Sequence, residues 1–110
     1  MDKEVSILKV LSEPTRLRLA ALLAGQTEVC VCQLAAAVSE PEYKVSRHLG
    51  IMRSAGLVEA RREGTWMYYK LAEPGCPLQM HLCDFLARDF DDHPMITADR
   101  EKLKQVGCGK

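Results

Sequence analysis

The sequence contains no apolar stretch long enough to cross a membrane. A membrane-spanning helix needs about 20 consecutive apolar residues, and the apolar runs in this 110-residue chain are far shorter. The segment Met1-Asp2-Lys3-Glu4 also lacks the basic and then apolar profile of a secretory signal peptide. Neither an internal repeat nor a low-complexity tract occurs. We therefore expect a single small globular protein of the cytoplasm, with no membrane partner.

The chain has no net charge that would attract nucleic acid to its whole surface. Its 15 Lys and Arg residues balance its 15 Asp and Glu residues. The charges are unevenly placed, however. Residues 43–70 hold six basic and two acidic residues, a net charge of +4, while residues 1–42 and residues 71–110 each carry −2. This local basic segment predicts a face that binds a polyanion such as DNA.

The five cysteines form neither an even set nor a C-x-x-C pair. An odd number cannot be paired completely in disulfides, and a small thiol reductase is expected to carry C-x-x-C near a βαβ unit. In a reducing compartment, clustered thiols serve metal binding or redox chemistry more often than structural bridges. No acid–base or nucleophile arrangement favours catalysis, so we predict a protein that is not an enzyme and has no small-molecule substrate. The cysteines are Cys30, Cys32, Cys76, Cys83 and Cys108.

Apolar residues that recur every three or four positions predict four helices in the first half of the chain. Pro14 is suited to the first turn of the second helix, and Gly25 is suited to its end. We interpret the segment from Ser39 to Glu42 as a capping box, with Ser39 as N-cap and Glu42 reaching back. The four helices are expected over residues 5–11, 14–24, 31–38 and 42–55.

From residue 57 the apolar period changes to two, which is typical of strands. Residues 57–62 and 65–71 are predicted to form a β-hairpin about a Glu63-Gly64 turn. A fifth helix is expected to begin at Pro77 and to end at His93-Pro94, followed by a short last helix over residues 97–106.

The fifth helix carries an apolar stripe that is wide for a peripheral helix, so we assign part of it to a dimer surface. Two helices joined by a short turn and followed by a hairpin form the layout of a winged helix-turn-helix. The predicted fold class is mainly α with a β-hairpin, a winged helix-turn-helix that forms a homodimer through its first and fifth helices. Residues 1–92 are expected to be the DNA-binding and dimerisation domain, and residues 93–110 a C-terminal tail with a short helix. The stripe consists of Leu78, Leu82, Phe85 and Leu86.

The expected partner is double-stranded operator DNA. The helix over residues 42–55 would enter the major groove, where Arg47 can pair with guanine. The hairpin tip would lie over the DNA backbone or the adjacent minor groove. His48 lies beside the apolar Leu49, a position more typical of packing or capping than of a ligand. The candidate DNA-binding residues are Tyr43, Lys44, Ser46, Arg47, His48, Arg61, Arg62, Gly64 and Thr65.

Several separate motifs, in order, resemble those of the ArsR/SmtB family of metal-responsive repressors. They are Glu28-Val-Cys-Val-Cys-Gln-Leu34, Lys44-Val-Ser-Arg-His-Leu49, Ala55-Gly-Leu-Val58, Arg61-Arg-Glu-Gly64 and Tyr69-Lys-Leu71. The resemblance implies a homodimer that leaves its own operator when a metal or metalloid binds. It also implies that Cys30 and Cys32 are ligands, that residues 43–50 are the recognition helix, and that residues 61–65 are the wing tip.

Two departures from the family pattern concern the ligands. The best-known arsenite sensors have a third cysteine three positions after the second, and here that position is Ala35. The cadmium sensors of the family use cysteines in a longer N-terminal arm, which this chain lacks. A zinc or nickel site on the fifth helix would have to use His81 with Asp84, or Asp89 with His93.

The spacing of the two cysteines creates a geometric problem. In a regular helix, residues two apart point about 200° from each other, so a site that uses Cys30 and Cys32 requires a distorted helix start. Trivalent arsenic, a three-coordinate thiophile, needs one more sulfur. We favour Cys108 between two glycines, then Cys83, while Cys76 is placed to cap the fifth helix.

Soft thiolate ligands favour soft ions, so As(III) or Sb(III) is the predicted inducer. Cd(II), Pb(II) and Zn(II) are the alternatives within the same fold. A thiol redox switch, in which disulfide formation is the signal, is a further alternative.

Overall fold

The computed structural model describes residues 1–106, and the predicted ligand Cys108 lies outside the described residues. Ten segments of regular structure are present in that part of the chain. They are α1 (Asp2–Leu11), α2 (Pro14–Leu23), β1 (Val29–Cys30), α3 (Val31–Val38), α4 (Glu42–Ser54), β2 (Val58–Glu63), β3 (Trp66–Leu71), α5 (Pro77–Arg88), the 3₁₀ turn η1 (Phe90–Asp92) and α6 (Pro94–Gln105). No helix within these residues is both long enough and apolar enough to span a bilayer.

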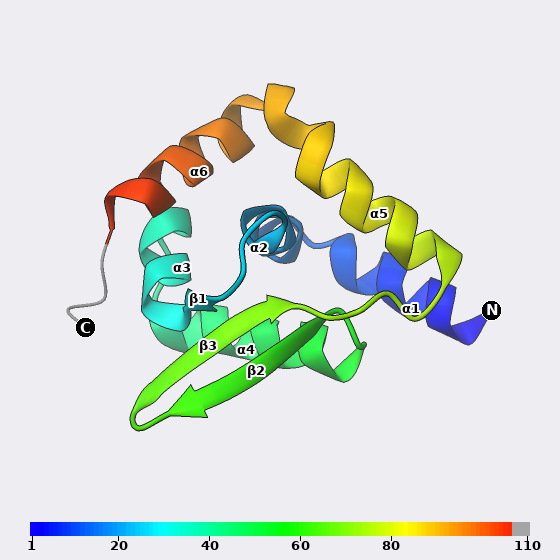
Figure 1. The fold of residues 1–110 in the computed structure, drawn as a ribbon, viewed down its shortest axis with the longest axis horizontal. Coiled ribbons are helices and arrows are strands. Elements are labelled where there is room, and N and C mark those ends of the chain that lie inside the picture. The colour runs from blue at the N-terminus through cyan, green and yellow to red at the C-terminus, as the bar shows by residue number, and fades with distance from the viewer. Residues whose placement is uncertain (107–110) are drawn as a thin grey trace.

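Helix α2 lies at the centre of the fold, and the other helices and the sheet surround it (Figure 1). Leu19, Leu22 and Leu23 of α2 are almost fully buried. The apolar stripes predicted for the third and fourth helices face the same core, where Leu34 and Leu49 have no exposed surface. Burial of each such side chain contributes about 1.5–3 kcal/mol, so the periodic leucines account for the helical framework.

The turn of the hairpin lies one residue later in the chain than predicted. Glu63 pairs with Trp66, so the two turn residues are Gly64 and Thr65 and not Glu63 and Gly64. Gly64 has a φ angle of 63°, a left-handed conformation that glycine adopts without a steric penalty. The turn is therefore centred on the residue pair that begins with this glycine.

The predicted capping box at Ser39 is wrong. Ser39 is the C-cap of α3, with φ 57° and ψ 45°, and Pro41 is the N-cap of α4. A residue in the left-handed conformation is a common way to end a helix. The link between the two helices is so short that Ser39 is used to end the first and cannot begin the second.

The last helix is longer than predicted and begins earlier. Helix α5 ends at Arg88, and α6 runs from Pro94 with His93 as its N-cap, where Nδ1 of His93 accepts a hydrogen bond from the backbone N–H of Met95 at 3.2 Å. Proline is favoured in the first turn of a helix, so Pro94 begins a helix and does not end the previous one. Helix α6 packs against α2 and α3.

A buried ion pair joins α6 to α2. Asp99 is 3% exposed, and Arg18 donates to both of its carboxylate oxygens, through Nε at 2.8 Å and Nη2 at 2.9 Å. Arg18 also donates to the carbonyl of Val38 at 3.4 Å, and Lys102 donates to Ser39 Oγ. These contacts hold α6 against the end of α3, directly before α4.

Candidate thiol site and nucleic-acid interface

The two neighbouring cysteines converge at the start of α3. Cys30 is the N-cap of this helix and has extended backbone angles, φ −71° and ψ 145°, whereas Cys32 lies within the first turn. Their Sγ atoms are 3.2 Å apart. The expectation that the helix start must be distorted is wrong, because Cys30 lies just outside the helix and its side chain does not follow the helical 100° step. The two sulfurs already face each other.

The surroundings of this pair hold Cys30 firmly. Cys30 is 2% exposed, and Cys32 is half-buried. The side-chain oxygen of Gln33 accepts a hydrogen bond from the Cys30 backbone N–H at 3.2 Å. The two-residue strand β1 also pairs with β3, with Cys30 opposite Tyr68. This strand was not predicted, because two residues are too few to show an alternating pattern.

The other described cysteines are not gathered at this site. Cys76 is the half-buried N-cap of α5, and Cys83 is half-buried on the same helix. Burial, reinforced by the charge of Asp84, raises the pKa of the Cys83 thiol, which disfavours the thiolate that binds metals. Within residues 1–106, no group of three or more His, Cys, Asp or Glu side chains is close enough to hold a metal ion.

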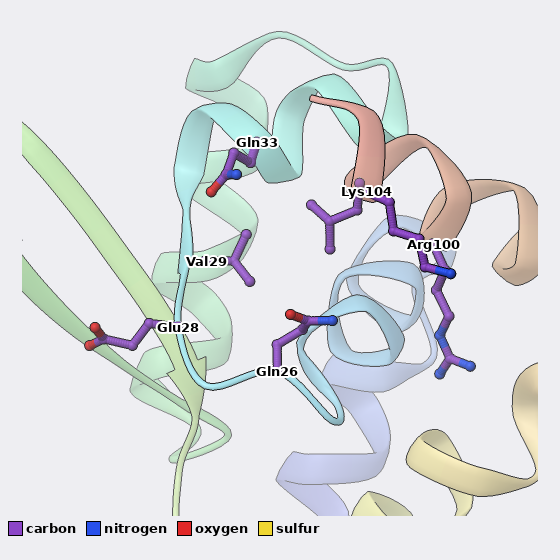
Figure 2. Close-up of a pocket in the computed structure, with 7 residues that line it drawn as sticks. Gln26, Glu28, Val29, Gln33, Arg100 and Lys104 are labelled. Atoms are coloured by element: carbon purple, nitrogen blue, oxygen red, sulfur yellow. The ribbon is translucent and has the colours of Figure 1, made fainter. Parts of the chain in front are cut away.

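A cavity of about 250 Å³ lies between the segment that leads into β1 and helix α6, and Val29 and Gln33, neighbours of Cys30 and Cys32 in the chain, line it. Figure 2 shows the side chain of Val29 directed into it, while Glu28 points away towards the hairpin. Gln33 Nε2 donates to the carbonyl of Val106 at 3.5 Å, which ties α3 to the end of α6. The lining residues are Gln26, Glu28, Val29, Gln33, Arg100, Leu103 and Lys104.

Helix α4 presents a polar face to solvent. Val45, Leu49 and Met52 are fully buried, which turns the remaining faces of the helix outward. Tyr43 is 70% exposed. Of the predicted DNA-binding residues on this helix, Tyr43, Ser46 and Arg47 are exposed and Lys44 and His48 are half-buried.

His48 contacts the start of α2. Its Nδ1 lies 3.3 Å from Glu13 Oε2 and 3.3 Å from Arg16 Nη1. Glu13 is the N-cap of α2 and accepts the backbone N–H of Thr15 at 2.8 Å. Burial raises the pKa of Glu13, but the Thr15 hydrogen bond and the charges of His48 and Arg16 outweigh it and lower the pKa below its ordinary value. His48 thus packs α4 against α2.

The wing residues Arg61, Arg62, Gly64 and Thr65 are all exposed. Arg61 is nevertheless engaged within the protein. It donates to Glu28 through Nε at 3.0 Å and through Nη2 at 2.9 Å, and its guanidinium lies 4.8 Å from the centre of the Tyr68 ring. Sequence reasoning missed this ion pair, because residues 28 and 61 are brought together only by the sheet.

Helices α1 and α5 contact each other at one side of the fold (Figure 1), and each leaves apolar side chains uncovered. The side chains that are 40–51% accessible are Val5, Leu8, Met80 and Phe85. Exposed apolar surface of this kind is a candidate interaction surface.

The helix pair α3–α4 followed by a β-hairpin defines the winged helix-turn-helix fold. The family model "Bacterial regulatory protein, arsR family" matches residues 13–60. The "Arsenical resistance operon repressor" of Escherichia coli (strain K12) is 38% identical over 102 residues, which are 93% of this chain and 80% of that protein. The chain belongs to the ArsR family of transcriptional repressors.

Two further relatives bear on the inducer and on assembly. A "Cadmium resistance transcriptional regulatory protein CadC homolog" of Staphylococcus aureus is 34% identical over 65 residues, 59% of this chain and 54% of that protein. The solution structure of the homodimeric winged helix-turn-helix DNA-binding domain Mb0332 of Mycobacterium bovis has a TM-score of 0.66 and 34% identity, covering 84% of this chain and 82% of that one. Metal-resistance regulators and a homodimer are therefore both among its relatives.

Proposed function

We propose that this chain is a homodimeric repressor that leaves its operator DNA when trivalent arsenic or antimony binds the thiolates of Cys30 and Cys32. The observation that carries the proposal is the 3.2 Å separation of the two sulfurs at the first turn of α3. This helix is the first of the two helices of the DNA-binding motif, so an ion held here acts directly on that motif.

The two sulfurs are close enough to bind one ion together. Their Sγ atoms lie 3.2 Å apart, so a single soft ion can bind both without a large movement of either side chain. Soft thiolate ligands favour soft ions, which supports As(III) or Sb(III) as the inducer. Cd(II), Pb(II) and Zn(II) are the alternatives that the test below separates.

A third sulfur completes the coordination of As(III). We assign this role to Cys108, because residues 1–106 supply no cluster of three ligands and the elevated pKa of Cys83 makes that thiol a poor donor. In this division of the chain, residues 1–92 bind DNA and dimerise, and residues 93–110 deliver the third ligand.

Operator binding uses two copies of α4. We assign the contacts on α4 to Tyr43, Lys44, Ser46, Arg47 and His48. Those on the wing are assigned to Arg61, Arg62, Gly64 and Thr65. The uncovered face of α1 and α5 is assigned to a second copy of the chain, which places the two recognition helices in successive major grooves.

Release follows if the metalloid binds more tightly to a conformer whose recognition helices are wrongly spaced. Coupling between two such sites is typically about 1–3 kcal/mol, or about 5–150-fold in affinity. A displacement of the start of α3 can be transmitted to α4 through the short link at Ser39, whose hydroxyl accepts a hydrogen bond from Lys102 of α6.

The test is fluorescence anisotropy of the reduced protein on DNA from upstream of its own gene. Arsenite, antimonite, Cd(II), Pb(II), Zn(II) and peroxide are added in turn to the wild type and to Cys30→Ser, Cys32→Ser and Cys108→Ser. Cys83→Ser is the matched control, because it removes a thiol from outside the site.

Release by arsenite or antimonite that disappears in the first three variants and persists in the control is the expected result. Release by Zn(II), Cd(II) or Pb(II) alone would assign the same fold to a divalent-metal sensor. Release by peroxide alone would make the thiols a redox switch. Unchanged operator affinity at saturating arsenite would refute the mechanism.

A further inference from the structure

The ion pair between Glu28 and Arg61 connects the thiol site with the wing. Arg61 presents the edge formed by Nε and Nη2 to the carboxylate, with both bonds at 3.0 Å or less. This two-bond fork fixes the plane of the guanidinium as well as its position. Glu28 lies two residues before Cys30, so the carboxylate that orients this wing arginine belongs to the segment that carries the thiols.

A second connection crosses the sheet. The strand order is β1-β3-β2, and Tyr68 on the middle strand is paired with Cys30 on one side and with Arg61 on the other. Residues directly opposite each other in antiparallel strands project from the same face and contact one another. The ring of Tyr68 accordingly lies beneath the Arg61 guanidinium. Tyr68 therefore connects Cys30 on β1 with Arg61 on β2.

We propose that Glu28 is a positioning residue that holds Arg61 ready for a DNA phosphate. When an ion occupies the Cys30–Cys32 pair, movement of β1 displaces Glu28, which directly precedes it, and disturbs Tyr68 through its pairing with Cys30, so that this contact is withdrawn. The second half of this inference rests on the proposed function. The first half concerns the protein without any metal.

The fork leaves part of the guanidinium available to DNA. Nε and Nη2 bind Glu28, while Nη1 lies 3.5 Å from Glu63 Oε2, a looser contact at the surface. The guanidinium is planar, so the hydrogens of Nη1 point away from the fork and can be donated to a phosphate while the fork is kept. Binding to DNA costs conformational entropy when a long side chain becomes ordered, and this cost is smaller if the side chain is already ordered in the free protein. Glu28 thus favours DNA binding in spite of its negative charge.

The experiment compares Glu28→Gln with Glu63→Gln. Both variants remove one negative charge beside Arg61, but only the first breaks the connection to β1. Simple electrostatics predicts that both bind the operator more tightly. Operator affinity is measured by anisotropy at several salt concentrations without metal, together with Arg61→Gln. Affinity and arsenite uptake by the thiols are then measured in the presence of arsenite.

Without metal, we expect Glu28→Gln to weaken operator binding and to lower the salt slope by about 1, the value for one lost phosphate contact, as Arg61→Gln does. Glu63→Gln should bind at least as tightly as the wild type. If Glu28→Gln and Glu63→Gln instead strengthen binding equally, Glu28 acts by charge alone and the positioning role is overturned.

With arsenite, Glu28→Gln should take up the ion normally. The factor by which arsenite weakens its operator binding should be about 2- to 30-fold smaller than in the wild type, the range for residues that transmit coupling. Glu63→Gln should keep the full change. Equal responses in both variants would overturn the route through Glu28. A wild type that ignores arsenite would refute the proposed inducer and this route together, while the metal-free comparison would still decide the role of Glu28 on DNA.

Discussion

Replacement of Arg18 by alanine should destabilise the protein severely, because it leaves a buried carboxylate without its cation. Asp99 is 3% exposed, and within residues 1–106 both of its oxygens are bound by Arg18. Removal of one partner from a buried ion pair costs about 3–5 kcal/mol. At about 4 °C for each kcal/mol in a domain of this size, Tm should fall by about 12–20 °C.

The assay is urea and thermal unfolding followed by circular dichroism at one fixed protein concentration, since dimerisation makes stability depend on concentration. The double variant Arg18→Met with Asp99→Leu is the control. An apolar pair of similar size removes both charges, so it should recover most of the loss. A loss below about 1 kcal/mol in Arg18→Ala, the value typical of an exposed pair, would show that water reaches Asp99 and would refute the docking of α6 on α2.

Three further predictions concern the wing, the helix cap and the dimer face. Gly64→Ala should cost about 1 kcal/mol in unfolding free energy because of the 63° φ angle, whereas Gly50→Ala within α4 should not destabilise the protein. The lowered pKa of Glu13 stabilises the fold above the ordinary pKa of 4.5, and this contribution is lost as the pH falls through the folded-state pKa. Glu13→Gln should therefore flatten the acid side of the stability–pH curve, and an unchanged curve would contradict the assignment. Leu8→Glu should yield monomers in sedimentation velocity and weaken operator binding, while Met95→Glu, at an equally exposed apolar position on α6, should remain dimeric.

Periodic patterns predicted the helical framework well, because the apolar stripes of α2, α3 and α4 are long enough to define a buried face. Local signals failed where two structures compete for the same residues. Ser39 has the chemistry of an N-cap but is needed to end α3. Pro94 is compatible both with the end of one helix and with the start of the next, and only the packing of α6 against α3 and α2 separates the two.

The sequence is enough to choose candidate residues for the site, but it does not predict their geometry. The Cys-x-Cys motif identifies the thiols, but the N-cap conformation of Cys30 decides that they converge. Charge patterning likewise identifies Arg61 as a wing cation. Its pairing with Glu28 depends on the register of a three-stranded sheet, which includes a two-residue strand that no pattern could predict.

In the proposed dimer, the position of the uncovered α1–α5 face sets the length of DNA that is protected. This face and the hairpin tip lie towards opposite ends of the longest axis of the chain, which measures 41 Å (Figure 1). Two copies joined at that face extend to at most twice this length, which corresponds to about 24 base pairs at about 3.4 Å each. A nuclease footprint on the operator should therefore be a single short window, with the two wings at its outer edges. Insertion of half a helical turn at its centre should place the half-sites on opposite sides of the duplex and abolish protection.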